Sequence, residues 1–583
     1  MWLAAGGAIF RNGEAKNVSI RVRLLMLLVA TALLGCTQVG PPSRAGEGPA
    51  PGAPPEKRIV YGVSQPIDIR PNANPVGRNY VQALIASPLT SRDGMGGRQP
   101  VLTTEVPSVE NGRWQVNPDG TMVTTFALRP GALWHDGAPV TADDFVFSIE
   151  VGRDRGLPAF GAPAFASISD ASAPDPLTFV VSWKEPFAGA DALFSIDLGY
   201  PTPLPRHLLA DAAATNADGF LDLPYWNEEF VGTGPFKLAS WDPGVGMRLR
   251  AHDGYALGRP KIDRIDVQVI PDANTLVANL LAGSVDVTPD LGTVDAGTQL
   301  RDQWRDGTVE FNLGAGTWSQ MVSQFLDPTP AAMRDVRFRT ALATAIDRQA
   351  IVDSVVGGLS PVPLSLLDPN QPQYASLEAS LPRFAYDPAQ AVQILLDAGY
   401  RRSGDGTFRD SDGQAISLEV RSSTQAVLGK AATAIADDWQ RVGLPARPVP
   451  TPPQLVNDRS YTSTFPAVWI KNGPTDVYGF RGFTSAAAPL ASKNFVAPSP
   501  TNSGRYMNPE LDDLIVTYFR TVPVNERVEV IGRIVHILTD QVVTLGLWYA
   551  VIPGASANRL SGVPPQWPSN AMCWNSWDWD VRG

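Results

Sequence analysis

Apolar and polar residues alternate with two different periods near the middle of the chain, and the two periods together predict a β-α-β unit. Val267 and Val269 alternate with polar neighbours, as expected for a strand with one buried face. Asp272 or Asn274 can cap the helix that follows. Its apolar face is expected to consist of four residues, Leu276, Val277, Leu280 and Leu281. Gly283 is placed to end the helix at positive φ, before a second strand pattern.

Two other stretches have the helical period. Thr141 can cap a helix with Asp144 in its first turn, where the helix dipole favours a carboxylate. The buried face of that helix is expected to hold Phe145, Val146 and Ile149. Residues 333–358 are predicted to form one long amphipathic helical region that Gly357 and Gly358 terminate. Strand and helix signals alternate from about residue 57 to the end, which predicts an α/β fold.

The N-terminal region has a different pattern. An apolar run at 24–34 would reach about 16 Å as a helix, too short to span a bilayer, and it ends at Cys36. This layout resembles a bacterial lipobox, with residues 1–35 as signal peptide and Cys36 as the lipid-bearing residue. An ordinary signal peptide is the alternative. Residues 36–56 are rich in Pro, Gly and Ala and are expected to form a flexible linker. The first fifteen or so residues do not suit the charged n-region of a signal peptide. A start of translation near Val18 is therefore a candidate.

Composition describes a globular protein, with 44% hydrophobic and 18% charged residues. The net charge of −11 argues against a nucleic-acid partner, which would require a basic face. If Cys36 is acylated, Cys573 has no intramolecular partner, so we expect no disulfide framework and a buried Cys573. No later apolar stretch is long enough to be a transmembrane helix.

Motifs for catalysis or cofactor binding are missing. The sequence contains no GxSxG, HExxH, phosphate-binding loop or GxGxxG, and its four histidines lack the spacing of a local zinc site. A metal site assembled from distant segments is the alternative. Residues 401–413 contain acidic residues and glycines but lack the glutamate of a calcium loop, so two tight turns at Asp405 and Asp412 are predicted instead. We therefore expect neither an enzyme nor a bound cofactor or metal.

Tryptophan is the enriched residue type, with fifteen in the chain. Some are expected in the core, and others can line a cleft, where a large flat side chain offers contact area at low entropic cost.

Six stretches resemble a known family. They are "LRPGALWHDGAPVTADDFVFSI", "VGTGPFKLASWDPG", "IPDANTLVANLLAGSVDV", "RDVRFRTALATAIDRQAIVDSV", "YDPAQAVQILLDAGY" and "GRYMNPELDDLI". In this order they resemble the extracytoplasmic solute-binding proteins of peptide-type ABC importers, the family 5 class that includes dipeptide-, oligopeptide- and nickel-binding members. The resemblance covers essentially the whole chain after the linker.

The resemblance implies a periplasmic-binding-protein-like α/β fold (class II, type C) with three lobes, a ligand cleft and a hinge. The implied lobes are lobe I at 57–83, 201–318 and 545–583, the inserted lobe II at 84–200, and lobe III at 319–544. The chain crosses between the clamping lobes near residues 318 and 545, where the hinge is expected.

The implied function is that of a substrate-binding lipoprotein of an ABC importer. It would be a monomer, lipid-anchored through Cys36 to the outer face of the bacterial cytoplasmic membrane. It would capture a peptide, or an oligosaccharide as the second possibility, and deliver it to an ABC permease with its ATPase subunits. The alternatives are a sensor that presents a solute to a membrane receptor, and a secreted hydrolase.

The resemblance also points to ligand-binding residues. Peptide-binding relatives hold the ligand's ammonium group with an aspartate shortly after a tryptophan in lobe III. Here Trp469 fits the tryptophan, but Asn472 stands three residues later and offers only a dipole to an ammonium group. Asp476 is the alternative carboxylate.

Three further candidates follow from their positions. Ser64 lies just after the first strand, and Trp318 and Gln320 lie at the first expected crossing between lobes. Trp318 is assigned either to the cleft or to the core. The final tryptophans, Trp574, Trp577 and Trp579, are expected in core or surface packing.

Overall fold

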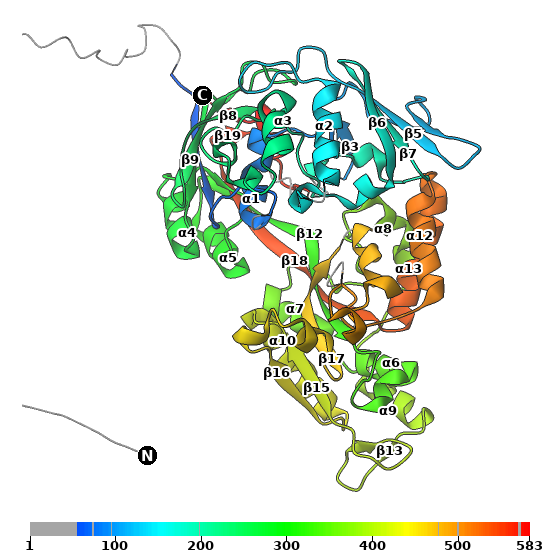
Figure 1. Cartoon of the computed structure of the whole chain (residues 1–583). Coiled ribbons are helices and arrows are strands. Elements are labelled where there is room, and N and C mark those ends of the chain that lie inside the picture. The colour runs from blue at the N-terminus through cyan, green and yellow to red at the C-terminus, as the bar shows by residue number, and fades with distance from the viewer. Residues whose placement is uncertain are drawn as a thin grey trace, which may run out of the picture. The chain divides into compact units, whose positions relative to one another are not determined.

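A ten-stranded mixed sheet is the largest sheet of the described residues in the computed structural model (Figure 1). The structure describes residues 55–583 except 73–74, 95, 155, 197–198, 476, 498–500, 569–572 and 583. From one edge to the other the strands are β16 (Ala446–Pro450), β15 (Leu418–Ser422), β17 (Val468–Pro474), β12 (Gly307–Ser323), β18 (Thr544–Ala557), β11 (Val287–Thr288), β1 (Arg58–Val63), β10 (Arg264–Val269), β9 (Gly246–Ala251) and β8 (Phe236–Asp242).

The two long central strands, β12 and β18, pair antiparallel along most of their length. Their register runs from Gly307 opposite Ala557 to Val322 opposite Thr544, with a shift between Leu313 and Trp318. One end of this pair carries β11, β1 and β10, and the other end carries β17 and β15. The crossings expected near 318 and 545 therefore fall within these two strands, while the division into lobes stays a prediction.

The β-α-β unit expected from the hydrophobic pattern is present. It consists of β10, α4 (Ala273–Leu281) and β11, and both strands pair parallel with β1. The Asp272 carboxylate caps α4 by accepting a hydrogen bond from the Thr275 amide at 2.8 Å, and Gly283 has φ +69°. The expected buried face was wrong in one residue, because Leu281 is 39% exposed. Leu281 is the last helical residue, so only the preceding turns pack against the sheet.

A four-stranded antiparallel sheet forms a second layer within residues 106–183. Its strand order is β4 (Trp114–Val116), β5 (Met122–Ala127), β7 (Thr178–Trp183) and β6 (Ile168–Asp175). Helix α2 (Ala142–Arg153) packs on it, as predicted. Phe145 and Ile149 are buried on this face, whereas Val146 is only half-buried.

Asp144 fixes the start of α2. Its carboxylate accepts hydrogen bonds from the Thr141 amide at 2.9 Å, the Arg206 amide at 3.0 Å and the Trp134 indole at 3.1 Å. The side chain is 3% exposed. The start of α2, the first residue of α3 (Arg206–Thr215) and a core tryptophan are thus joined by one carboxylate.

The single helical region predicted at 333–358 is two helices, α6 (Val336–Thr344) and α7 (Arg348–Val356). Asp347 interrupts the region because its side chain accepts a hydrogen bond from the Ala350 amide at 2.9 Å and starts a new helix. Gly357, with φ +61°, ends α7 as expected. The hairpin predicted at 401–413 is confirmed by the pairing of β13 (Arg401–Arg402) with β14 (Phe408–Arg409).

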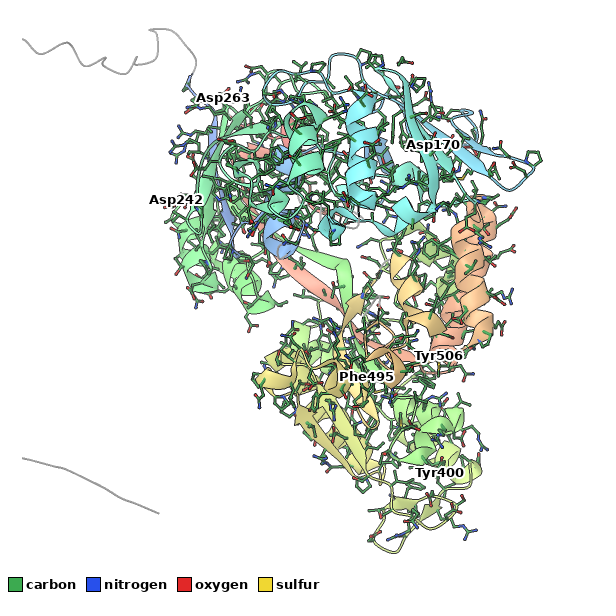
Figure 2. All side chains as sticks on the ribbon, in the orientation of Figure 1. Asp170, Asp242, Asp263, Tyr400, Phe495 and Tyr506 are labelled. Carbon is green, nitrogen blue, oxygen red and sulfur yellow. The ribbon has the colours of Figure 1, made fainter. Side chains whose placement is uncertain are left out.

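The remaining elements cover the sheets or form small hairpins. They are the helices α1 (Pro75–Ile85), α3 (Arg206–Thr215), α5 (Val294–Gln303), α8 (Pro372–Leu377), α9 (Pro388–Asp397), α10 (Ala426–Arg441), α11 (Arg459–Ser463), α12 (Pro509–Arg520) and α13 (Val524–Asp540), and the strands β2 (Thr90–Arg92), β3 (Arg98–Pro100), β19 (Leu560–Ser561) and β20 (Asp580–Val581). In Figure 2, Tyr400 lies beside α6 and α9, where its ring packs at 5.1 Å from that of Phe338.

The loop after β7 contacts α12 directly. The Ala188 amide donates to the Phe519 carbonyl at 2.8 Å, and Arg527 donates to the Ala188 carbonyl at 2.9 Å. The Arg481 guanidinium lies between two rings, 5.3 Å from the centroid of Phe187 and 4.0 Å from that of Phe519. Polar and cation–π contacts therefore join the inserted sheet to the C-terminal helices.

The C-terminal segment closes the fold around a buried thiol. Cys573 is 1% exposed, as predicted, and its Sγ lies 3.1 Å from the Tyr61 hydroxyl. Burial raises the pKa of Cys573 to about 12. Trp579 is buried, while Trp574 and Trp577 are half-buried and pack edge to face on each other.

In the part of the chain that the structure describes, no helix is long and apolar enough to cross a membrane. The described residues also contain no group of three or more His, Cys, Asp or Glu side chains placed to hold a metal ion.

Asp144→Ala is expected to lower the free energy of unfolding by about 2–4 kcal/mol, because one buried and two partly buried donors lose their acceptor. Urea denaturation followed by circular dichroism measures the change. The matched control is Asp143→Ala, which removes an exposed carboxylate from the same helical turn and is expected to cost less than about 1 kcal/mol. Equal losses in the two variants would contradict the role assigned to Asp144.

Candidate functional site

Two of the predicted site residues, Trp318 and Gln320, lie on the same face of β12. Trp318 is 2% exposed, and its ring lies 6.5 Å from that of Tyr549 in a stacked arrangement. It lines a small buried pocket together with Arg348, whose pKa is lowered to about 10 by burial. The structure thus places Trp318 in packed surroundings.

Gln320 is 1% exposed, and its amide oxygen and nitrogen both lack a hydrogen-bond partner among the described residues. A Cβ on Gly473 would come within 1.9 Å of the Gln320 nitrogen, so the amide approaches the β17 backbone closely. Two unpaired buried polar atoms are costly, which marks Gln320 as a residue with unused binding capacity.

Trp469 and Lys471 share the other half of this face, on β17. The Lys471 ammonium lies 4.9 Å from the Trp469 ring centroid and 3.5 Å from the Ser503 hydroxyl. Burial lowers the pKa of Lys471 to about 8. Trp469 is 8% exposed, and its indole N–H has no partner among the described residues.

Asn472 points to the opposite face of β17 because it is three residues from Trp469. It is exposed, accepts a hydrogen bond from the Ser319 hydroxyl at 2.9 Å, and donates one to Gln425 at 3.1 Å. The structure therefore does not bring Asn472 together with Trp469. Asp476 and Cys36 lie outside the described residues.

Ser64 belongs to a buried hydroxyl chain at the end of β1. Its Oγ lies 2.9 Å from the Tyr80 hydroxyl, and Tyr80 donates to the Asp290 carboxylate at 2.8 Å. Burial raises the pKa of Tyr80. This chain ties β1, α1 and the loop after β11 together, at a distance in sequence from the other predicted residues.

A larger pocket, here called the junction pocket, was missed by the sequence analysis. It has about 560 Å³ of space and is lined by four segments that are far apart in the chain. These segments contribute Arg92, Asp93, Gly94 and Gly96; Asn312 and Leu313 of β12; Asp368, Asn370 and Gln371; and Gln566, Trp567 and Pro568. In the predicted division into lobes, these segments belong to lobe II, lobe I, lobe III and lobe I, in that order.

Three buried polar atoms of the junction pocket have no hydrogen-bond partner among the described residues. They are the Asn312 side-chain nitrogen, the Gln371 side-chain oxygen and the Trp567 indole nitrogen. The remaining polar atom of each amide is used, since Asn312 accepts from the Trp567 backbone at 3.3 Å and Gln371 donates to the Thr475 carbonyl at 2.9 Å. Among the described residues, two donors and one acceptor of the pocket lining are therefore buried without a hydrogen-bond partner.

The junction pocket also carries opposite charges. Burial raises the pKa of Asp368 to about 6, and the positive charge of Arg92 acts in the opposite direction. The Asp368 carboxylate accepts a hydrogen bond from the Asn370 amide at 2.9 Å. Arg92 also lines a second pocket of about 620 Å³, together with Arg98, Asp191 and Arg527. That neighbouring pocket, with three arginines and one aspartate, suits an anionic group.

Known protein families include one that matches much of this chain. Residues 106–489 match the family model described as "Bacterial extracellular solute-binding proteins, family 5 Middle". The oligopeptide-binding protein AppA of Bacillus subtilis is 26% identical over 337 residues, covering 56% of this chain and 58% of that protein.

Two solved structures share the fold. The structure of AppA from Bacillus subtilis in complex with a nonapeptide has a TM-score of 0.66 at 18% identity, covering 91% of this chain and 100% of that one. NikZ from Campylobacter jejuni, in complex with Ni(L-His), has a TM-score of 0.69 at 20% identity, covering 90% and 100%. The chain spans a little over half of the length of the curated relatives it matches first, between 51% and 58%.

Asp368→Asn is expected to raise the free energy of unfolding at pH 8 by about 1–2 kcal/mol. The pKa of Asp368 in the folded protein is about 6, above its ordinary value of 3.8, so keeping the carboxylate charged costs stability above about pH 6. The difference between variant and parent should shrink as the pH falls from about 6 to about 4. Denaturant titrations at several pH values measure it.

The control for this prediction is Asp405→Asn, which replaces an exposed aspartate in a similar turn. Asp405 accepts from the Thr407 amide at 3.0 Å, and this hydrogen bond lowers its pKa. Its replacement should therefore change stability in the opposite direction at neutral pH. A pH-independent effect of Asp368→Asn would contradict the assignment.

Proposed function

Since the chain belongs to the bacterial extracellular solute-binding proteins of family 5, we propose that it captures a solute between its lobes and delivers it to a membrane permease. The proposed role needs no covalent chemistry. ATP hydrolysis would belong to separate subunits of the ABC importer.

The junction pocket is the observation that carries this proposal. Its lining comes from four distant segments, so a ligand inside it would contact the inserted lobe, β12, residues 368–371 and the C-terminal segment at once. Contacts with several parts of the chain are what a ligand needs in order to stabilise one relative arrangement of those parts. The unpartnered atoms of Asn312, Gln371 and Trp567 supply the polar contacts.

A peptide is the ligand class that fits best. A peptide backbone carries carbonyl groups that can accept from Asn312 and Trp567, and amide groups that can donate to Gln371. The arginines of the neighbouring pocket offer partners for carboxylates. The fold it shares with AppA bound to a nonapeptide agrees with this class.

The proposed location is the outer face of the bacterial cytoplasmic membrane, with the mature protein held as a monomer through lipid on Cys36. A diacyl anchor binds stably because each buried CH₂ group contributes about 0.8 kcal/mol. The Pro- and Gly-rich residues after Cys36 would give the binding unit reach to the permease.

Trp567→Phe is expected to weaken binding of the co-purifying solute by about three- to tenfold, because the ring is kept while one hydrogen-bond donor is lost. Native mass spectrometry measures the occupancy, and the mass released on denaturation identifies the solute. The matched control is Trp241→Phe, since the Trp241 indole nitrogen on β8 is also buried and unpartnered but lies outside the pocket. Equal solute occupancy in both variants would contradict the proposed site. The absence of any bound solute in the parent protein would contradict the proposed function.

Cys36→Ser is expected to abolish incorporation of labelled fatty acid and to release the protein from the membrane fraction. Membrane fractionation after metabolic labelling measures both. Retention of the label in the variant would contradict lipidation at Cys36.

A further inference from the structure

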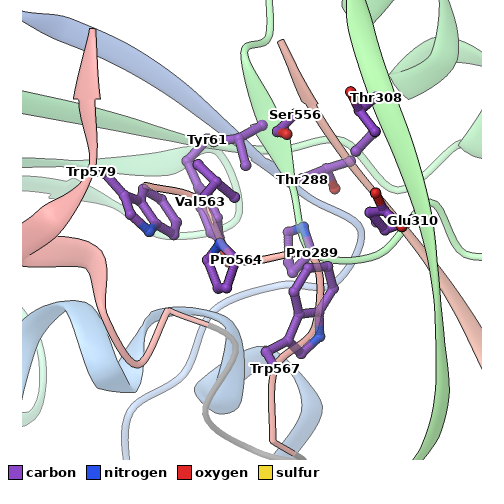
Figure 3. A pocket seen from close by; sticks show the side chains of 13 residues that line it. Tyr61, Thr288, Pro289, Thr308, Glu310, Ser556, Val563, Pro564, Trp567 and Trp579 are labelled. Carbon is purple, nitrogen blue, oxygen red and sulfur yellow. The ribbon is translucent and has the colours of Figure 1, made fainter. Parts of the chain in front are cut away.

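A second pocket shares Trp567 with the junction pocket (Figure 3). This aromatic pocket has about 350 Å³ of space between β1, β11, β18, β12 and the C-terminal segment. Strand register aligns its floor, because Tyr61 lies opposite Val287, Val287 opposite Ser556, and Ser556 opposite Thr308. These four residues therefore face the same side of the sheet.

The walls of the aromatic pocket are mainly apolar. Figure 3 shows Tyr61 and Trp579 at one end, Glu310 and Trp567 at the other, and Pro289 and Pro564 between them. The Trp567 ring rests on the backbone of Gly554, where a Cβ would come within 2.1 Å of it. A side chain at position 554 would thus displace the ring, so a glycine is required for this wall.

Glu310 is a charged residue in this mainly apolar lining. It projects from β12 two residues before Asn312, and it is partly buried. None of the hydrogen bonds or ion pairs among the described residues includes Glu310, and its pocket is lined by no described Lys, Arg or His. The hydroxyls of the two threonines in the pocket are used elsewhere, since Thr288 donates to the Asp290 carbonyl at 3.1 Å and Thr308 to Asn558 at 3.4 Å.

A partly buried carboxylate without a counter-charge is unfavourable, and it gains most from a ligand that brings a positive charge. Aromatic rings and a single carboxylate are the surroundings that attract organic ammonium groups, through their negative ring faces and Coulomb attraction. A metal ion, in contrast, would require several oxygen ligands. We propose that the aromatic pocket binds an organic ammonium group attached to an apolar body, with Glu310 as its counter-ion.

This inference rests on the proposed binding function and assigns to it a charge preference. The proposed site assigns the recognition of a positive charge to Glu310 on β12 instead of Asn472. Asn472 is exposed and hydrogen-bonded to Ser319 and Gln425. A solute that occupies both pockets would place its ammonium group beside Glu310 and its hydrogen-bonding groups beside Asn312. Trp567 lines both pockets.

The test uses two small probes of nearly equal shape, phenethylamine, which is protonated at neutral pH, and 2-phenylethanol, which is neutral. Isothermal titration of the purified full chain is expected to show millimolar or tighter binding of the amine and at least about tenfold weaker binding of the alcohol. Glu310→Gln is expected to remove this preference by weakening amine binding about tenfold, with the alcohol unaffected. The matched control is Glu529→Gln, which neutralises an exposed carboxylate on α13 and should leave both affinities unchanged.

Equal affinity for the two probes, no binding of the amine, or an unchanged preference in Glu310→Gln would each overturn the ammonium site. The proposed solute-binding function fails separately, by the absence of a co-purifying solute. Glu310→Gln is expected to fold like the parent protein, because the substitution keeps the shape and volume of the side chain. Circular dichroism of the variant checks this.

Discussion

The antiparallel pairing of β12 with β18 is the constraint on which the rest of the structure depends. These two strands are 17 and 14 residues long, and all other strands of the main sheet are added to one end or the other of the pair. The register shift between Leu313 and Trp318 divides β12 into two parts. Before the shift, Glu310 and Asn312 face the two pockets, and after it, Trp318 and Gln320 face packed side chains. A change in the pairing of β12 with β18 would therefore alter both the lining of the two pockets and the connection between the two ends of the main sheet.

Much of the fold is predictable from the sequence because its signals are local. The cap at Asp272, the glycine at 283 and the apolar spacing between them are all contained in one short segment, and the α/β fold class follows from repeating such segments. The break between α6 and α7 was missed, because Asp347 has the same chemistry whether it lies on a helix surface or caps a new helix. The exposure of Leu281 was missed for a related reason, since periodicity does not show where the packing partner ends.

The candidate site was much less predictable. Strand alternation alone separates Asn472 from Trp469, so that part of the geometry was readable in the sequence. The junction pocket was not, because Arg92, Asn312, Gln371 and Trp567 lie far apart in the sequence and belong to no motif. What identifies Asn312, Gln371 and Trp567 is that each has one buried atom without a hydrogen-bond partner among the described residues, a property that exists only once the chain is folded. Fifteen tryptophans in the sequence gave no means of selecting Trp567.

The central claim is that a solute binds in the junction pocket and uses the polar atoms left unpaired by the fold. A crystal structure of the protein purified with its own solute tests this most directly. The account predicts solute density within hydrogen-bond distance of the Asn312 nitrogen, the Gln371 oxygen and the Trp567 indole nitrogen. Solute density elsewhere, with these three atoms bonded only to water or to one another, would contradict it.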